Sequence, residues 1–82
     1  MNISEQDFRF MTEGITSDLI QMLMDRKHQT LSQAIAAVYN SNVYNALMRP
    51  STGLYAQSSG YIYHYLTKEL DIEHTSDKCL AH

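Results

Sequence analysis

The stretch that decides the fold is residues 30–50, "TLSQAIAAVYNSNVYNALMRP". Thr30 is followed three residues later by Gln33, which matches the capping-box pattern at the start of a helix. The polar letters NSN then interrupt the apolar pattern, because Asn and Ser side chains compete for backbone hydrogen bonds. Ser41 can cap a further short helix, which Pro50 ends. The stretch therefore predicts two helices joined by a tight turn, an arrangement that resembles a helix-turn-helix.

A longer helix is expected before this stretch. Apolar residues recur at intervals of three or four from Phe8 to Met22, which places them on one stripe. Ser4 is the expected N-cap. Gly14 lies inside the pattern and costs about 1 kcal/mol relative to alanine, so a continuous helix and a helix broken at Gly14 both stay open.

A fourth helix is expected after the stretch. The letters RPSTG are favourable for a turn, and residues near 53–57 are expected to be extended. Ser58 or Ser59 then caps a helix that runs to about Leu70. The fold class predicted is all-α: a compact bundle of about four helices with a helix-turn-helix-like middle and one short extended segment near 53–57. We expect one helical domain at 1–72 and a disordered tail at 73–82.

Length and composition narrow the class of protein. The chain has 82 residues, of which 44% are hydrophobic, and it has one cysteine. No apolar run approaches the roughly 18 residues that a membrane span needs. The beginning, "MNISEQDF", has neither the basic nor the apolar segment of a signal peptide. We therefore expect a soluble cytoplasmic protein that neither spans nor binds a membrane.

Charge is distributed unevenly along the chain. The formal net charge is −3, and between His28 and Thr67 the only formally charged side chain is Arg49. Two explanations stay open: the charge-poor section packs inside a small domain, or it forms a protein–protein contact surface, where charged residues are depleted and Tyr and Met are enriched. The acidic balance makes nucleic-acid binding an unfavourable alternative, because that affinity rests on Lys and Arg.

Tyrosines gather in residues 53–65, "GLYAQSSGYIYHY", which hold four of them. Tyr61 and Tyr65 lie four apart and share a helix face, so we expect them in the core or at its edge. Tyr63 points elsewhere. The expected exposed, partner-binding residues are therefore the four side chains Tyr44, Met48, Tyr55 and Tyr63.

DNA binding is the alternative interpretation of the middle section. A recognition helix there would present Asn42, Asn45 and Arg49, and Asn and Arg are residue types that read adenine and guanine. Basic residues that could anchor phosphates are missing from the section, and this disfavours the alternative.

Signatures of catalysis or metal binding are few. No G-x-S-x-G turn occurs, and the three glycines form no phosphate loop. Pairing of Ser59 with His64 is a weak candidate for catalysis. Cys79 with His74 and His82 gives three potential ligands, whereas a structural zinc site usually has four. We expect no enzyme activity, no metal and no cofactor.

Residues 40–70, "NSNVYNALMRPSTGLYAQSSGYIYHYLTKEL", resemble a pattern found in small helical bacterial proteins. The positions that carry the resemblance are Leu47, Thr52, Gly53, Leu54, Tyr55, Ser58, Tyr61, Tyr63 and Leu66. The resemblance implies an accessory or antitoxin-like component that acts beside a larger partner, in some cases one like an ADP-ribosyltransferase. The function expected is a non-enzymatic interaction module that binds a partner protein or self-associates as a dimer.

Overall fold

The computed structural model describes the backbone of residues 3–81 and the side chains of residues 3–71. The described part consists of four α-helices and two short 3-10 turns, with no strand. In chain order these elements are α1 (Glu5–Lys27), α2 (Leu31–Tyr39), α3 (Asn42–Leu47), η1 (Pro50–Thr52), η2 (Leu54–Ala56) and α4 (Ser59–Ala81). The all-α fold class is confirmed, and α2 and α3 form the predicted helix-turn-helix-like middle.

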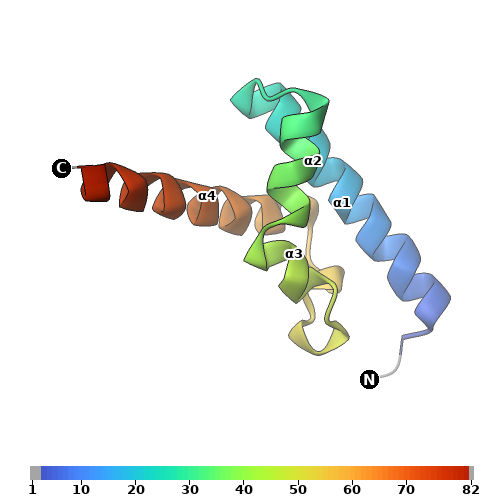
Figure 1. Cartoon of the computed structure of the whole chain (residues 1–82). Coiled ribbons are helices and arrows are strands. Elements are labelled where there is room, and N and C mark those ends of the chain that lie inside the picture. Colours follow the sequence, from blue (N-terminus) through green and yellow to red (C-terminus); the bar gives the residue numbers. More distant parts are fainter. Residues whose placement is uncertain (1–2, 82) are drawn as a thin grey trace.

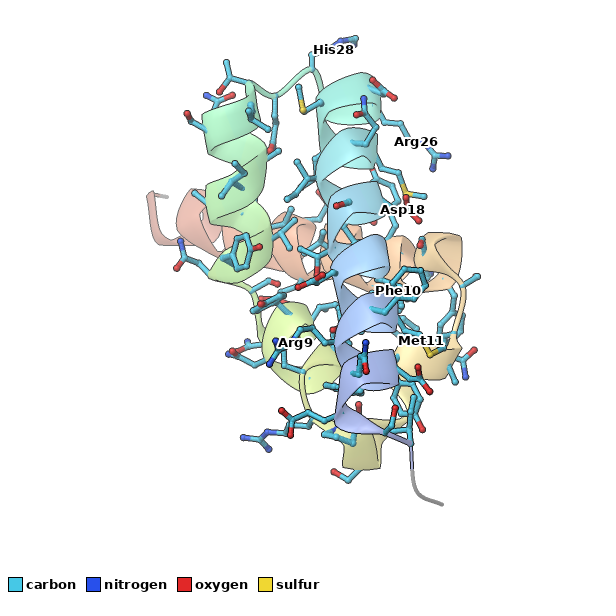
Figure 2. The ribbon with its side chains drawn as sticks, turned by 90° about the vertical axis from the view of Figure 1, so that its right-hand side faces the viewer. Arg9, Phe10, Met11, Asp18, Arg26 and His28 are labelled. Carbon is cyan, nitrogen blue, oxygen red and sulfur yellow. The ribbon has the colours of Figure 1, made fainter. Side chains whose placement is uncertain are left out.

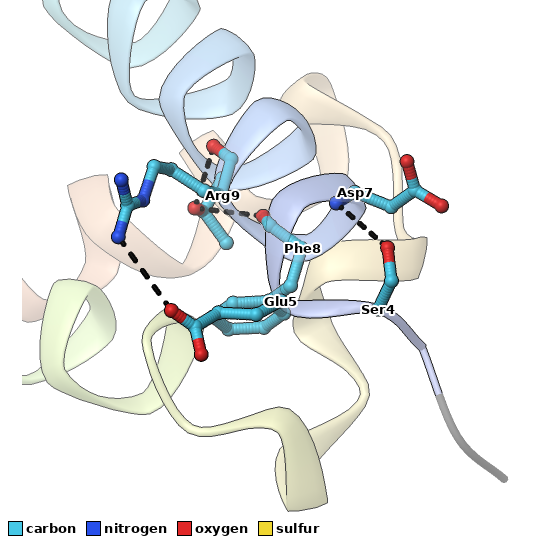
Figure 3. Close-up of polar contacts among 6 residues, drawn as sticks. Ser4, Glu5, Asp7, Phe8 and Arg9 are labelled. Carbon is cyan, nitrogen blue, oxygen red and sulfur yellow. Dashed lines mark hydrogen bonds and ion pairs between the residues drawn. The ribbon is translucent and has the colours of Figure 1, made fainter.

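Helix α1 is continuous through Gly14, so the first of the two open alternatives holds. Its N-terminus is capped as predicted, because the backbone N–H of Asp7 donates to Ser4 Oγ at 3.1 Å (Figure 3). One turn further on, an exposed ion pair joins Arg9 to Glu5 at 3.8 Å. Exposed pairs of this spacing contribute only about 0.3–0.5 kcal/mol, so the cap is the stronger local signal.

The capping box that opens α2 is present in full. The backbone N–H of Gln33 donates to Thr30 Oγ1 at 3.2 Å, and the N–H of Thr30 donates to Gln33 Oε1 at 2.9 Å. Two residues separate α2 from α3, and Ser41 Oγ accepts the N–H of Tyr44 at 3.0 Å. Ser58, rather than Ser59, caps α4 by accepting a backbone N–H at 3.2 Å. Local hydrogen bonds therefore set the starts of α2, α3 and α4.

The core lies where the four α-helices meet. Helices α1 and α2 pack side by side in opposite directions, and α4 crosses them and projects away from the rest (Figures 1 and 2). The small side chain of Ala34 on α2 allows close approach of α1. The fully buried apolar side chains are Leu19, Leu23, Ala34, Val38, Leu47, Ile62 and Leu66. Fully burying one Leu or Ile side chain contributes about 1.5–3 kcal/mol, so these few residues carry most of the stabilisation.

The prediction of an extended segment near 53–57 is wrong in its local geometry. Gly53 adopts φ 72°, a left-handed conformation that glycine reaches without steric cost, and it links the turns η1 and η2. The Thr52 hydroxyl donates to the carbonyl of Ala46 at 2.6 Å, which holds the first turn against the end of α3. The chain therefore curls at Gly53, and Gln57 alone among 54–57 takes an extended conformation as it leaves η2.

Helix α4 continues to Ala81, beyond the end expected near Leu70. The side chains of residues 72–82 lie outside the described residues, so the division between a domain at 1–72 and a tail at 73–82 stays a prediction. In the part of the chain that the structure describes, no helix is both long and apolar enough to traverse a bilayer.

Candidate functional site

The tyrosines of α4 occupy the opposite positions to those predicted. Tyr63 keeps only 7% of its surface exposed and belongs to the core, with the Arg26 guanidinium carbon 5.1 Å from its ring centre. Tyr61 and Tyr65 are exposed at 45% and 46%. The prediction of Tyr63 as an exposed contact is therefore wrong. Tyr61 and Tyr65, expected in the core or at its edge, are exposed.

Unequal cover by the neighbouring helices explains this reversal. Ile62 and Leu66 turn the most apolar face of α4 inward, and tyrosines lie on both flanks of that face. The 23-residue helix α1 covers the flank that carries Tyr63. The six-residue helix α3 is too short to cover the other flank, so Tyr61 and Tyr65 remain exposed.

Tyr55 lies apart from the other predicted partner-binding residues. Its ring packs edge-on against Phe8 of α1, with ring centres 5.3 Å apart, and it is half-buried. This contact attaches η2 to the beginning of α1. The structure therefore gives Tyr55 a packing role on the side of α1 that also bears Phe10 and Met11 (Figure 2).

Tyr44 and Met48 do come together, and Tyr39 joins them. The Tyr39 and Tyr44 rings pack edge-to-face with centres 4.7 Å apart. With Met48 and the Arg9 side of α1 they line a hollow of about 460 Å³, which we call the α1–α3 hollow. Arg9 points to this side of α1, opposite Phe10 and Met11 (Figure 2). Tyr39 was not predicted from the sequence, although it is the last residue of α2 and directly precedes the turn that leads into α3.

The pKa of Tyr44 responds both to burial and to a neighbouring tyrosine. Partial desolvation, and then the proximity of Tyr39, raise the pKa of Tyr44 above its ordinary value. Tyr44 therefore stays a neutral phenol at physiological pH, able to donate or accept one hydrogen bond while its ring packs. Met48 and Tyr39 are 40% and 47% exposed, so both apolar surfaces are open to a partner.

A second hollow lies between α3 and α4, and we call it the α3–α4 hollow. It has a volume of about 300 Å³ and is lined by Asn42, Val43, Ala46, Leu54, Tyr61, Ile62 and Tyr65. Its walls are almost wholly apolar, and none of the lining side chains carries a formal charge. The Tyr61 and Tyr65 hydroxyls lie 3.3 Å apart, and this hydrogen bond is the main cause that raises the pKa of Tyr61, with the proximity of Tyr65 second.

Glu69 of α4 fixes the position of α3. The backbone N–H of Asn42 donates to Glu69 Oε2 at 2.8 Å, and that of Val43 donates to Oε1 at 3.0 Å. One carboxylate thus satisfies two amides at the start of α3, where the helix dipole favours negative charge. We call this contact the Glu69 clamp. No local sequence pattern predicts this contact, because Glu69 lies 27 residues after Asn42 and 26 residues after Val43.

The residues of the DNA-binding alternative are all exposed, but they do not share one helix. Asn42 and Asn45 belong to α3, whereas Arg49 lies beyond its last residue, at the start of η1. The Glu69 carboxylate occupies the beginning of the would-be recognition helix, where it would repel phosphate. The three residues therefore do not form a single recognition helix.

The weak candidate for catalysis is not assembled. The Ser59 hydroxyl donates to Asp18 Oδ2 at 2.6 Å, which ties the start of α4 to α1. His64 instead packs edge-on against Tyr65, with ring centres 5.8 Å apart. Among the described residues, no three His, Cys, Asp or Glu side chains are grouped closely enough to hold a metal ion. Three further histidine and cysteine candidates lie outside the described side chains: His74, Cys79 and His82.

No family model matches this chain, and neither a curated protein nor a solved structure matches it significantly. The comparisons therefore assign the chain to no family, and function has to be argued from its own surfaces.

Proposed function

We propose that this protein is a non-enzymatic interaction module that binds a partner protein through the α1–α3 hollow. The observation that carries the proposal is the cluster of exposed Tyr39 and Met48 around half-buried Tyr44, three adjacent side chains of the types enriched in protein interfaces. The most specific version of the proposal is an antitoxin-like or accessory subunit. The other version is a module that self-associates as a dimer.

The composition of the rim supports a protein partner. Arg9 and Glu13 bring opposite charges to the α1 side of the hollow, while the two tyrosines and the methionine contribute, with Ile20, its apolar part. Energetically dominant residues of interfaces are enriched in Tyr and Arg, surrounded by polar contacts that exclude water. The paired tyrosine rings also hold each other in place, so little conformational entropy is lost when a partner docks.

The test is a tagged pull-down from nuclease-treated lysate of the native host, with the eluate weighed by intact mass spectrometry. We expect a stoichiometric second polypeptide with the wild type. Replacing Tyr39 and Met48 together by alanine should weaken its capture at least about tenfold, since each exposed anchor is worth about 1–2 kcal/mol. Both side chains are exposed, so the variant should keep the helical content of the wild type.

A matched control is the double variant Tyr61→Ala with Tyr65→Ala, which removes an equally exposed aromatic pair from α4. This variant should still capture the partner. Light scattering of the 9.4 kDa chain reports self-association in the same samples. A monomer that captures no polypeptide contradicts the proposal, and so does a partner that is lost only in the α4 control.

A further inference from the structure

The α3–α4 hollow differs in chemistry from the surface proposed for a partner protein. Its walls come from α3, η2 and α4, and almost all of their exposed atoms are carbon. We propose that this hollow binds a small neutral molecule with a fused pair of aromatic rings. The inference is independent of the proposed function, because it uses a different face of the molecule.

Volume sets the size of the ligand. Pockets for small molecules begin at about 300 Å³, and a protein cavity of about 150 Å³ is known to bind benzene. At about 300 Å³, the α3–α4 hollow has room for roughly two such rings. A single-ring side chain from a partner would fill only part of it.

Charge sets the class of ligand. No formally charged side chain lines the hollow, and the nearest carboxylate on α4, that of Glu69, is already bonded to two backbone amides. An ionic ligand would lose its hydration there without gaining an opposite charge. A neutral aromatic ligand would instead pack against the rings of Tyr61 and Tyr65, whose centres are 5.1 Å apart.

The Glu69 clamp makes the hollow a preformed one. It joins the first residues of α3 to α4, and two lining residues, Asn42 and Val43, supply the amides of the clamp. On the α4 side, the buried side chain of Ile62 forms part of the wall. A cavity whose walls are fixed before binding needs little reorganisation, which favours affinity.

The experiment is a titration of the full-length chain with naphthol, followed by two-dimensional amide NMR. We expect saturable binding with a dissociation constant on the order of 0.1–1 mM, in line with the affinity of ligands of this size. The shifted amides should cluster at Asn42, Ala46, Tyr61 and Tyr65. Naphthoate and naphthylmethylammonium, which keep the rings but carry a charge, should bind at least about tenfold more weakly.

Two variants locate the site. Ala46→Phe places a ring inside the hollow and should weaken naphthol binding at least about tenfold, whereas Ala36→Phe on α2, outside this hollow, should not. If Ala46→Phe does not fold, Tyr65→Ala becomes the deciding variant. It removes a half-exposed side chain from the wall of the hollow and leaves the core unchanged. The proposal is overturned by the absence of saturable binding, by equal affinity for the charged analogues, or by unchanged affinity in the folded hollow variant.

Discussion

His28 ends α1 in a left-handed conformation, with φ 55° and ψ 33°, and its backbone N–H donates to the carbonyl of Leu23. A residue with a Cβ pays about 1–2 kcal/mol in this region, whereas glycine does not. The His28 side chain is exposed, so its removal costs little packing. We expect His28→Gly to raise the free energy of unfolding in urea by about 0.5–1 kcal/mol. This figure allows for the greater flexibility that glycine gives the unfolded chain, which offsets part of the gain. His28→Ala is the control and should give no gain; a glycine variant less stable than wild type would contradict the argument.

Tyr63 offers a second residue-scale prediction. Its hydroxyl is buried and has no hydrogen-bond partner among the described atoms, while its ring fills the core. Tyr63→Phe should leave stability unchanged or raise it by about 1 kcal/mol, and Tyr63→Ala should lower it by about 3–5 kcal/mol in thermal and urea unfolding. Tyr61→Ala, at an exposed position of the same helix, should cost less than about 1 kcal/mol. The reverse order of the two alanine variants would mean that Tyr61 is the core residue.

Tyr63 is buried and the pair Tyr61 and Tyr65 is exposed, the reverse of what local spacing along the helix led us to predict. Spacing along α4 correctly placed Tyr61 and Tyr65 on one face and Tyr63 on another. It could not tell which face α1 covers, because that depends on how helices distant in sequence cross. The same limit applies to Tyr39, whose importance comes from its contact with Tyr44 across the turn.

Among the elements, α3 is the one most dependent on its neighbours. With six residues it is far below the roughly 12–15 at which an isolated helix becomes marginally stable. Glu69→Ala removes two charge-assisted hydrogen bonds from its first amides and should cost about 1.5–3 kcal/mol. Hydrogen exchange should quicken most at Asn42 and Val43. Asp71→Ala, at an exposed position two residues further along α4, is the control and should stay within about 0.5 kcal/mol. Equal losses in both variants would show that the clamp contributes nothing.

Helix starts were predictable from sequence because their chemistry is local. Ser4, Thr30 and Ser41 each cap a helix through a residue three positions away. The continuity of α1 through Gly14 was undecidable, since tertiary packing along 23 residues outweighs a local penalty of about 1 kcal/mol. The curl at Gly53 was missed because glycine fits both extended and left-handed backbone. The left-handed form is held by hydrogen bonds of the folded turns, made by the Thr52 hydroxyl and by the backbone of Gly53.

At the scale of the whole molecule, the described core ends before the C-terminal part of α4. Among the side chains of residues 3–71, those of the buried core and its half-buried neighbours all lie at or before Leu70. The predicted domain boundary at residue 72 implies that a chain which stops there should melt within a few degrees of the full-length protein in circular dichroism. A chain that stops after Tyr65 loses Leu66 and Glu69 and should not show a cooperative transition. A large drop in melting temperature for the longer truncation would disprove the domain boundary.

Alkaline pH should weaken the whole fold. The pKa values of Tyr44 and Tyr61 are raised in the folded state, so the unfolded chain releases these protons at lower pH. Their contribution to stability is complete below about pH 10 and is lost as pH rises through the folded pKa values. The double variant Tyr44→Phe with Tyr61→Phe should flatten the decline in urea midpoint above about pH 10, compared with wild type. An unchanged slope would mean that other groups cause the decline.

The Glu69 clamp also orders the steps by which the chain becomes structured. Helices α1 and α2 are separated by three residues and pack on each other, so their hairpin closes a short loop and can form early. The clamp closes a loop of 26 residues or more, whose entropic cost must be met before α3 gains its amide partners. We therefore expect α3 to order last and to open first. Both proposed binding surfaces draw on α3, so a fluctuation that releases this one helix dismantles both at once while the hairpin of α1 and α2 persists.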